Sequence, residues 1–235
     1  MQILITGTSR GLGNGLAGFY LNRGHTVYGI SRTANPGLDS HPSFHFLPLD
    51  LSDFNAVEEV LPEFLRKAGK LNLAVLNAGM LGEIKDMKDT SLKEIRKVMD
   101  INVWSNKVLI DLMYENLEHV SQIVAVSSGA AIFGNRGWNA YSISKAALNM
   151  LVKLYSRERE ETHFSSIAPG LIDSDMQEYI FSLDDDQRFP SLNRLKDQKS
   201  SGRMPSAAEA AEILAKSILK AHNEESGSFL DVREM

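Results

Sequence analysis

A glycine-rich turn near the amino terminus constrains the fold of this chain more than any other feature. Residues 2–5 form a short apolar run typical of a strand, residues 6–13 (Thr-Gly-Thr-Ser-Arg-Gly-Leu-Gly) form the turn, and a helix is expected to about Arg23. Glycines at such a turn let the backbone approach a pyrophosphate, and the helix N-terminus offers it unpaired N–H groups. The context predicts a nucleotide-binding site at the start of a βαβ unit.

Strand and helix patterns alternate along the rest of the chain. Further strands are expected at 26–30, 43–47, 73–76, 121–126, 163–168 and 228–232. Helices are expected from a cap at Ser52 or Asp53 to about 67, over 91–116 and 140–160, and from Ser206 to about 221. This order predicts one α/β domain over 1–235, with a mainly parallel sheet covered by helices on both faces.

One segment, residues 172–205, lacks a regular core pattern. It is expected to form a lid or a flexible insertion beside the substrate. Met176, Tyr179, Ile180 and Phe181 fit either a cover over the substrate or a short helix that faces the core.

Composition excludes several classes of protein. The net charge of −5 argues against a general nucleic-acid binder, and the absence of cysteine excludes a disulfide scaffold or a thiolate metal site. No apolar run approaches the length of a membrane span, and no targeting segment is visible. We therefore expect a cytoplasmic protein without a bound metal, a nucleic-acid partner or a membrane partner.

A tyrosine and a lysine are spaced to share one face of a helix. Tyr141 and Lys145 lie at i and i+4, and Ser128 lies thirteen residues before Tyr141. An ammonium beside a phenol lowers the pKa of the phenol, which lets a tyrosine exchange protons at neutral pH. The same spacing also fits an ordinary amphipathic helix, and Ser128 also fits a plain strand end. The rest of the chain has to decide between these interpretations.

The end of the second strand bears on the choice of cofactor. An acid there would bind the ribose 2′-hydroxyl of NAD, but the sequence reads Ser31-Arg32. Arg32 can pair with a 2′-phosphate, Arg10 adds a cation inside the turn, and Ser31 can donate a hydrogen bond. The sequence therefore predicts NADP(H) in preference to NAD(H), unless Arg32 is a solvated loop cation.

With these motifs in order, the chain resembles the short-chain dehydrogenase/reductase family, and within it the compact carbonyl-reductase-like and sepiapterin-reductase-like members. The resemblance covers residue 2 to about residue 176, where Ser174 replaces the usual threonine. It implies a Rossmann-type, doubly wound sheet of seven parallel strands in the order 3-2-1-4-5-6-7. The motifs that carry it are Thr6-Gly7-x-x-x-Gly11-x-Gly13, Asp50-Leu51, Asn77-Ala78-Gly79, Asn102, Ser128, Tyr141-x-x-x-Lys145 and Pro169-Gly170.

The resemblance also implies roles for individual residues in interconverting a carbonyl and an alcohol. Tyr141 would be the general acid, Ser128 would hold the carbonyl oxygen, Lys145 would tune Tyr141 and hold the nicotinamide ribose, and Asn102 would position a water. The implied cofactor contacts are Gly7, Ser9, Arg10, Gly11, Leu12, Gly13, Ser31, Arg32, Asp50, Leu51, Asn77, Ala78, Gly79, Tyr141, Lys145, Pro169, Gly170, Ile172 and Ser174. Phe133 and Trp138 are expected either to line the substrate pocket or to pack in the core.

The leading hypothesis is an NADP(H)-dependent reductase of a small carbonyl compound. One alternative is a 3-oxoacyl-carrier-protein reductase, for which Arg157 and Arg159 would have to dock an acidic carrier among neighbouring glutamates. Another is a nucleotide-sensing protein without turnover. A homodimer or homotetramer is expected, with the helices over 91–116 and 140–160 pairing through residues such as Ala147, Met150, Leu151 and Leu154. The carboxyl terminus lacks the Asp-Gly-Gly ending of many tetrameric members.

Overall fold

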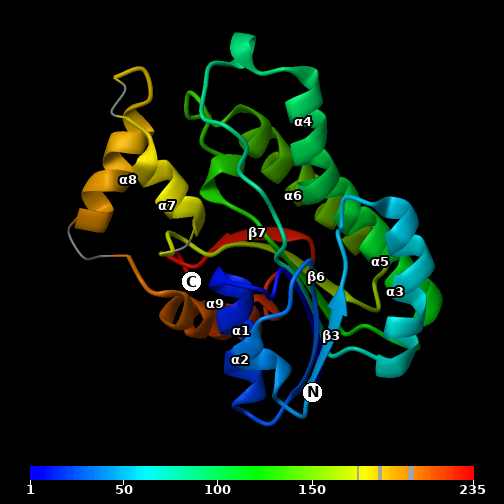
Figure 1. Ribbon diagram of the computed structural model, residues 1–235. Coiled ribbons are helices and arrows are strands. Elements are labelled where there is room, and N and C mark those ends of the chain that lie inside the picture. Colours follow the sequence, from blue (N-terminus) through cyan, green and yellow to red (C-terminus); the bar gives the residue numbers. More distant parts are fainter. Residues whose placement is uncertain (174, 185–186, 201–203) are drawn as a thin grey trace.

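The computed structural model describes residues 1–173, 175–184, 187–200 and 204–235. Within these residues, parallel strands form one seven-stranded sheet in the order β3-β2-β1-β4-β5-β6-β7, which confirms the predicted topology (Figure 1). The strands are β1 (Gln2–Thr6), β2 (Thr26–Ser31), β3 (Phe44–Pro48), β4 (Leu73–Leu76), β5 (Gln122–Val126), β6 (His163–Ala168) and β7 (Ser228–Asp231).

Helices cover both faces of the sheet because each strand alternates its apolar side chains between two cores. Leu4 of β1 joins one core, which α3 (Phe54–Ala68), α5 (Ser105–Asn116) and α6 (Asn139–Glu158) complete. Ile3 and Ile5 of the same strand join the other core, which α1 (Gly11–Leu21) and α9 (Ala207–Ala221) complete. This arrangement buries the central strands on both sides, as their continuous apolar sequences require.

Side-chain caps fix the starts of several helices. Asp53 accepts a hydrogen bond from the Ala56 N–H at the start of α3. Ser91 and Ser206 each form a reciprocal capping box with a glutamate three residues later, and so begin α4 (Leu92–Met99) and α9. Of the two caps predicted for α3, Ser52 and Asp53, the structure therefore selects Asp53.

The helix predicted over 91–116 is interrupted. Between α4 and α5, residues Asp100–Trp104 form a π-helical turn (η2). The Ser105 hydroxyl and the Asn106 amide donate to the carbonyl oxygens of Ile101 and Asn102, at 2.6 and 2.9 Å, so these carbonyls keep partners in the wider turn. Such turns are frequent at functional sites, and this one carries Asn102.

The segment predicted as a lid or flexible insertion contains two helices instead of irregular chain. They are α7 (Asp175–Ser182) and α8 (Pro190–Ser200), which Figure 1 shows on the side of the molecule away from α3 and α5. A short helix, α2 (Pro36–Asp39), also escaped prediction, although Asn35 caps it and proline begins it. Within the described ranges, no helix combines the length and apolar character needed to cross a membrane.

Candidate active site

A cavity of about 1110 Å³ opens beyond the carboxyl ends of the strands. Its walls run from the turn after β1 to the amino-terminal part of α6, and residues of α7 and α8 line its outer side. In open α/β sheets, this crevice beside the point where the strand order reverses is the usual place for a ligand.

The turn after β1 is shaped for close approach of a ligand to the backbone. Gly7 has a φ of +76°, a region that side chains rarely adopt. A Cβ added at Gly13 would lie 2.2 Å from the Gly7 carbonyl oxygen, so only glycine permits α1 to start this close to the turn. Gly7 and Gly11 line the cavity, whereas Gly13 supports the turn from beneath.

A hydrogen-bond brace holds this turn against β4. The Thr6 hydroxyl accepts from the backbone N–H groups of Asn77 and Ala78, both at 2.9 Å, and the Asn77 amide donates to the Thr6 carbonyl at 2.9 Å. The Asn77-Ala78-Gly79 motif therefore fixes the floor of the cavity, and all three of its residues also line it.

Charged side chains gather at the end of the cavity next to β2. Arg32 is exposed and lines the cavity with Asp50 and Lys97. Hydrogen bonds from Ser52 lower the pKa of Asp50, and the charges of Arg32 and Lys97 act in the same direction. Ser31 is buried, and its hydroxyl donates to the Thr33 carbonyl at 2.9 Å. Two cations therefore border this end of the cavity.

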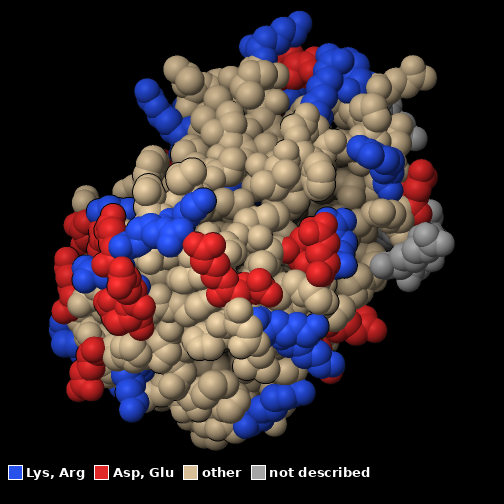
Figure 2. Space-filling model, turned by 180° about the vertical axis from the view of Figure 1, so that it is seen from behind, with Lys and Arg blue, Asp and Glu red and all other residues tan. Residues whose placement is uncertain are grey.

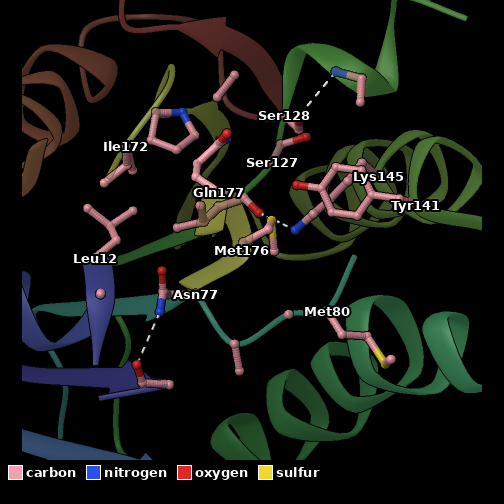
Figure 3. A pocket seen from close by; sticks show the side chains of 18 of the residues that line it. Leu12, Asn77, Met80, Ser127, Ser128, Tyr141, Lys145, Ile172, Met176 and Gln177 are labelled. Carbon is pink, nitrogen blue, oxygen red and sulfur yellow. Dashed lines mark hydrogen bonds between the residues drawn. The ribbon is translucent and has the colours of Figure 1, made fainter. Parts of the chain in front are cut away.

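Three candidate catalytic side chains meet at the opposite end. Figure 3 shows the Tyr141 hydroxyl directed toward Ser128, with Lys145 behind the tyrosine ring. The Lys145 Nζ donates to the Val126 carbonyl at 2.7 Å and lies 5.7 Å from the centre of the Tyr141 ring. The Ser128 hydroxyl accepts from the Ala130 N–H at 3.1 Å, which leaves its own proton available for another acceptor.

Burial controls the proton affinities of these groups. Burial raises the pKa of Tyr141, and a hydrogen bond involving Ser128 acts in the opposite direction. Burial lowers the pKa of Lys145 to about 8. Burial thus shifts the pKa of Tyr141 upward in this chain. The lowering of that pKa by Lys145 stays a prediction.

Asn102 lies beneath the cavity and does not line it. Its side chain is fully buried, accepts from the Met80 N–H at 2.8 Å, and donates to the Met80 carbonyl and the Ser144 hydroxyl, both at 2.9 Å. These bonds join η2 to the loop after β4 and to α6. Asn102 is therefore placed to hold that loop and the helix that carries Tyr141.

The outer wall packs on Trp138, at the start of α6. Trp138, Tyr141, Ile180 and Phe189 belong to one buried apolar cluster. The Trp138 Nε1–H donates to the Ser191 hydroxyl at 2.8 Å and so joins α8 to the site. Trp138 therefore combines the two expectations for it, since it lines the cavity and also packs in a core.

Most residues predicted as cofactor contacts line this cavity. The exceptions are Gly13, which lies beneath the turn, and Ser174, which is outside the described residues. The ones that line it are Gly7, Ser9, Arg10, Gly11, Leu12, Ser31, Arg32, Asp50, Leu51, Asn77, Ala78, Gly79, Tyr141, Lys145, Pro169, Gly170 and Ile172.

Sequence reasoning missed several lining residues. Asp231 ends β7 and Arg233 follows it. Because parallel strands end at the same edge of the sheet, these positions could have been predicted to lie near the cavity. Lys97 and Gln177 lie on helices whose orientation no motif fixes. Further unpredicted lining residues are Met80, Ile101, Leu171, Ser191, Arg194, Leu195 and Gln198.

Three proteins with similar sequences are named as reductases. A benzil reductase of Saccharomyces cerevisiae, named as forming (S)-benzoin, is 35% identical over 195 residues, which cover 76% of this chain and 74% of the relative. A benzil reductase of Bacillus subtilis is 28% identical over 242 residues and covers 98% of both chains. A 3-oxoacyl-carrier-protein reductase of Vibrio harveyi is 28% identical over 222 residues, covering 90% of this chain and 86% of the relative.

Solved structures agree with this. A short chain dehydrogenase/reductase of S. cerevisiae superposes with a TM-score of 0.86 at 25% identity, covering 98% of this chain and 95% of the other. The family model described as short chain dehydrogenase matches residues 1–184. The chain belongs to the short chain dehydrogenase family of oxidoreductases, which use a nicotinamide cofactor.

Proposed function

We propose that the protein is an NADP(H)-dependent reductase of a carbonyl compound, with Tyr141 as its general acid. The observation that carries this proposal is that Ser128, Tyr141 and Lys145 lie on the wall of the same cavity as the glycine turn after β1. The crowded glycine turn, where a Cβ at Gly13 would meet the Gly7 carbonyl, fits a pyrophosphate held by backbone groups. A bound nicotinamide cofactor supplies the hydride.

The side chains at the catalytic end then handle the oxygen and its proton. As the carbonyl carbon gains hydride, negative charge grows on the oxygen, and Ser128 donates a hydrogen bond to it. Tyr141 transfers its proton to that oxygen, so that the C=O double bond is replaced by new C–H and O–H bonds. Burial keeps the Tyr141 phenol protonated at neutral pH, which is the form a reduction needs. The Lys145 ammonium stabilises the phenolate until solvent returns the proton.

The preference for NADP(H) is supported by charge. Arg32 is exposed beside the cavity at the end of β2, where an acid would favour the 2′-hydroxyl of NAD. Lys97, which no motif predicted, adds a second cation on the α4 side of the same end. A 2′-phosphate between them would gain charge-assisted hydrogen bonds.

The names of the relatives favour a vicinal diketone as the substrate. Two similar proteins are benzil reductases, and the substrate end of this cavity has apolar walls that include Trp138, Met176 and Ile180. The carrier-protein alternative has less support. Arg157 pairs with Glu225 at 2.7 Å, and the Arg159 guanidinium lies 4.3 Å from the centre of the Tyr114 ring, so both proposed docking cations already have partners.

An activity screen tests the proposal. NADPH consumption should rise with benzil or another diketone and stay low with a carrier-bound 3-oxoacyl thioester. NADH should serve less well. If no aldehyde, ketone or diketone in a broad panel accelerates NADPH consumption, the reductase assignment is wrong.

We also propose that two copies associate through α6. Ile143, Met150 and Leu154 follow one another on one side of this helix, and about half of each side chain is exposed (43%, 55% and 54%). Figure 2 shows an area without charged side chains in the middle of the upper part of the rear face, bordered by charged side chains at its top and sides. Leu151 instead packs against the core. Light scattering should give a mass of about twice 26.1 kDa, and a single-chain mass would exclude this dimer.

A further inference from the structure

One buried polar atom in the cavity wall has no protein partner. Gln177 of α7 lines the cavity, and its side chain is only 8% exposed. Its Oε1 receives no hydrogen bond from any described residue. Because most buried side-chain polar atoms are paired, an orphaned acceptor in a ligand cavity points to a donor on the ligand.

The position of Gln177 associates it with the substrate end. Gln177 and Ile180 are three residues apart and share one face of α7. Ile180 is fully buried in the cluster that contains Trp138 and Tyr141. Figure 3 draws Gln177 beside Met176, between Ile172 and the Ser128–Tyr141 pair in that view. The orphaned oxygen therefore belongs to the part of the wall that approaches the candidate proton donor.

The unpaired Gln177 oxygen should favour a ligand that carries a hydroxyl at this place over one that does not. A buried acceptor without a donor makes the folded protein less stable, and a ligand hydroxyl that pairs with it removes that cost. A ligand of the same shape with a methyl group in place of the hydroxyl leaves the cost in place. Reduction of one carbonyl of a vicinal diketone, the substrate class proposed above, yields an α-hydroxy ketone. When the remaining carbonyl of this compound faces Tyr141, its hydroxyl lies next to the reacting carbonyl.

We propose that Gln177 is the specificity residue of the substrate site, and that its Oε1 accepts a hydrogen bond from a hydroxyl next to the reacting carbonyl. The site then binds α-hydroxy ketones in preference to plain ketones of the same shape, and so takes them as substrates for reduction of the carbonyl that remains. This inference rests on the carbonyl reductase function proposed above.

The test uses two ketones that differ only in a hydroxyl and a methyl group, α-hydroxyisobutyrophenone and pivalophenone. Calorimetry measures their binding to the NADP⁺ complex, in which neither the ketone nor the tertiary alcohol can react. The wild-type protein should bind the hydroxy ketone about 10-fold more tightly. Gln177→Met should reduce this ratio to about 1. Glu178→Met, an exposed position on the same helix, is the matched control and should retain the ratio.

The possible results separate cleanly. If the wild-type protein binds the two ketones with equal affinity, or binds neither of them, the proposal is wrong. This result does not depend on whether the Gln177→Met variant folds. An unchanged ratio in a folded Gln177→Met protein overturns the proposal too. If Gln177→Met instead weakens NADP⁺ and both ketones in parallel, the amide serves the cofactor carboxamide and the substrate assignment is wrong. Failure of the reductase function would show separately, as the absence of NADPH consumption, while the binding ratio still reports on Gln177.

Discussion

The two walls of the cavity are held in different ways. The wall formed by the strand ends is tied together through the backbone: Thr6 accepts from two backbone N–H groups after β4, and Lys145 donates to the carbonyl of Val126 at the end of β5. The wall formed by α7 and α8 is attached mainly through side chains. Trp138 donates to Ser191, and Arg188 lies 3.6 Å from Asp86.

This difference indicates that the groups that react and the groups that recognise the substrate lie on separate walls. Groups that exchange a proton must keep their distances within tenths of an ångström, so they lie where parallel strands and a long helix fix the backbone. Groups that recognise the substrate lie on a segment whose few side-chain attachments can change without disturbing the sheet. Mutations on the strand wall should therefore abolish turnover, and mutations on the helical wall should mainly change substrate affinity.

The largest effect is expected at Tyr141. Tyr141→Phe removes the phenolic proton but keeps the ring in its apolar cluster with Trp138 and Ile180. Turnover should fall about 10²- to 10⁴-fold, the usual contribution of a general acid. Affinity for NADPH, measured by fluorescence titration, should change little. Normal turnover in this variant would show that another group donates the proton.

The second-largest effect is expected at Lys145, where one substitution should lower activity and raise stability. Lys145→Met should lower turnover about 100-fold, because the Tyr141 phenolate loses its ammonium. It should also raise the free energy of unfolding by about 1–3 kcal/mol at neutral pH, because burial lowers the pKa of Lys145 from 10.5 to about 8.

The pH dependence of that gain follows from the two pKa values. Below pH 8 the lysine is protonated in both the folded and the unfolded protein, and the folded state bears the full cost of the buried charge. Between about 8 and 10.5 the folded protein releases its proton first, so the cost declines. The advantage of Lys145→Met in chemical denaturation should therefore shrink above pH 8. A destabilised variant at neutral pH would contradict the assigned cost.

How much the sequence predicts also differs between the two walls. The strand wall was predictable because its motifs follow strands whose order and polarity place them at one edge, as for Asn77 after β4 and Ser128 after β5. The sheet order was predictable too, although it rested on the family resemblance. The π-helical turn η2 between α4 and α5 was not predictable. Such a turn keeps the apolar periodicity of an α-helix to within one residue, so the sequence pattern does not reveal it.

The helical wall was less predictable for a physical reason. The α8 sequence is mostly polar, and its buried contacts, such as Ser191 with Trp138 and Leu192 with the Phe189 cluster, come from separate elements. No local periodicity encodes a hydrogen bond between residues 53 positions apart. The effect of burial on the pKa of Tyr141 was not predictable for a related reason, because burial of a side chain depends on the elements that cover it.

At the cofactor end, Arg32 tests whether the strand wall also sets cofactor choice. Arg32→Ala should weaken NADPH about 10- to 100-fold, the value of one or two lost charge-assisted hydrogen bonds, and should leave NADH nearly unchanged. Dissociation constants for both cofactors, measured at two salt concentrations, check this, because the ionic contribution declines with salt. Equal losses for the two cofactors would place Arg32 away from the 2′-phosphate.

The smallest effect is expected where the helical wall joins the strand wall. Ser191→Ala removes the acceptor of the buried Trp138 Nε1–H, which costs about 1–3 kcal/mol if nothing replaces it. Because α8 carries no group that reacts, KM should rise about 2- to 10-fold while kcat changes less than 2-fold, and hydrogen exchange should accelerate in α7 and α8 but not in β1 or β4. Ser191→Thr, which keeps the hydroxyl, is the matched control and should restore most of the affinity. A fall in kcat as large as the rise in KM would mean that this contact also positions Tyr141, and that the two walls are not independent.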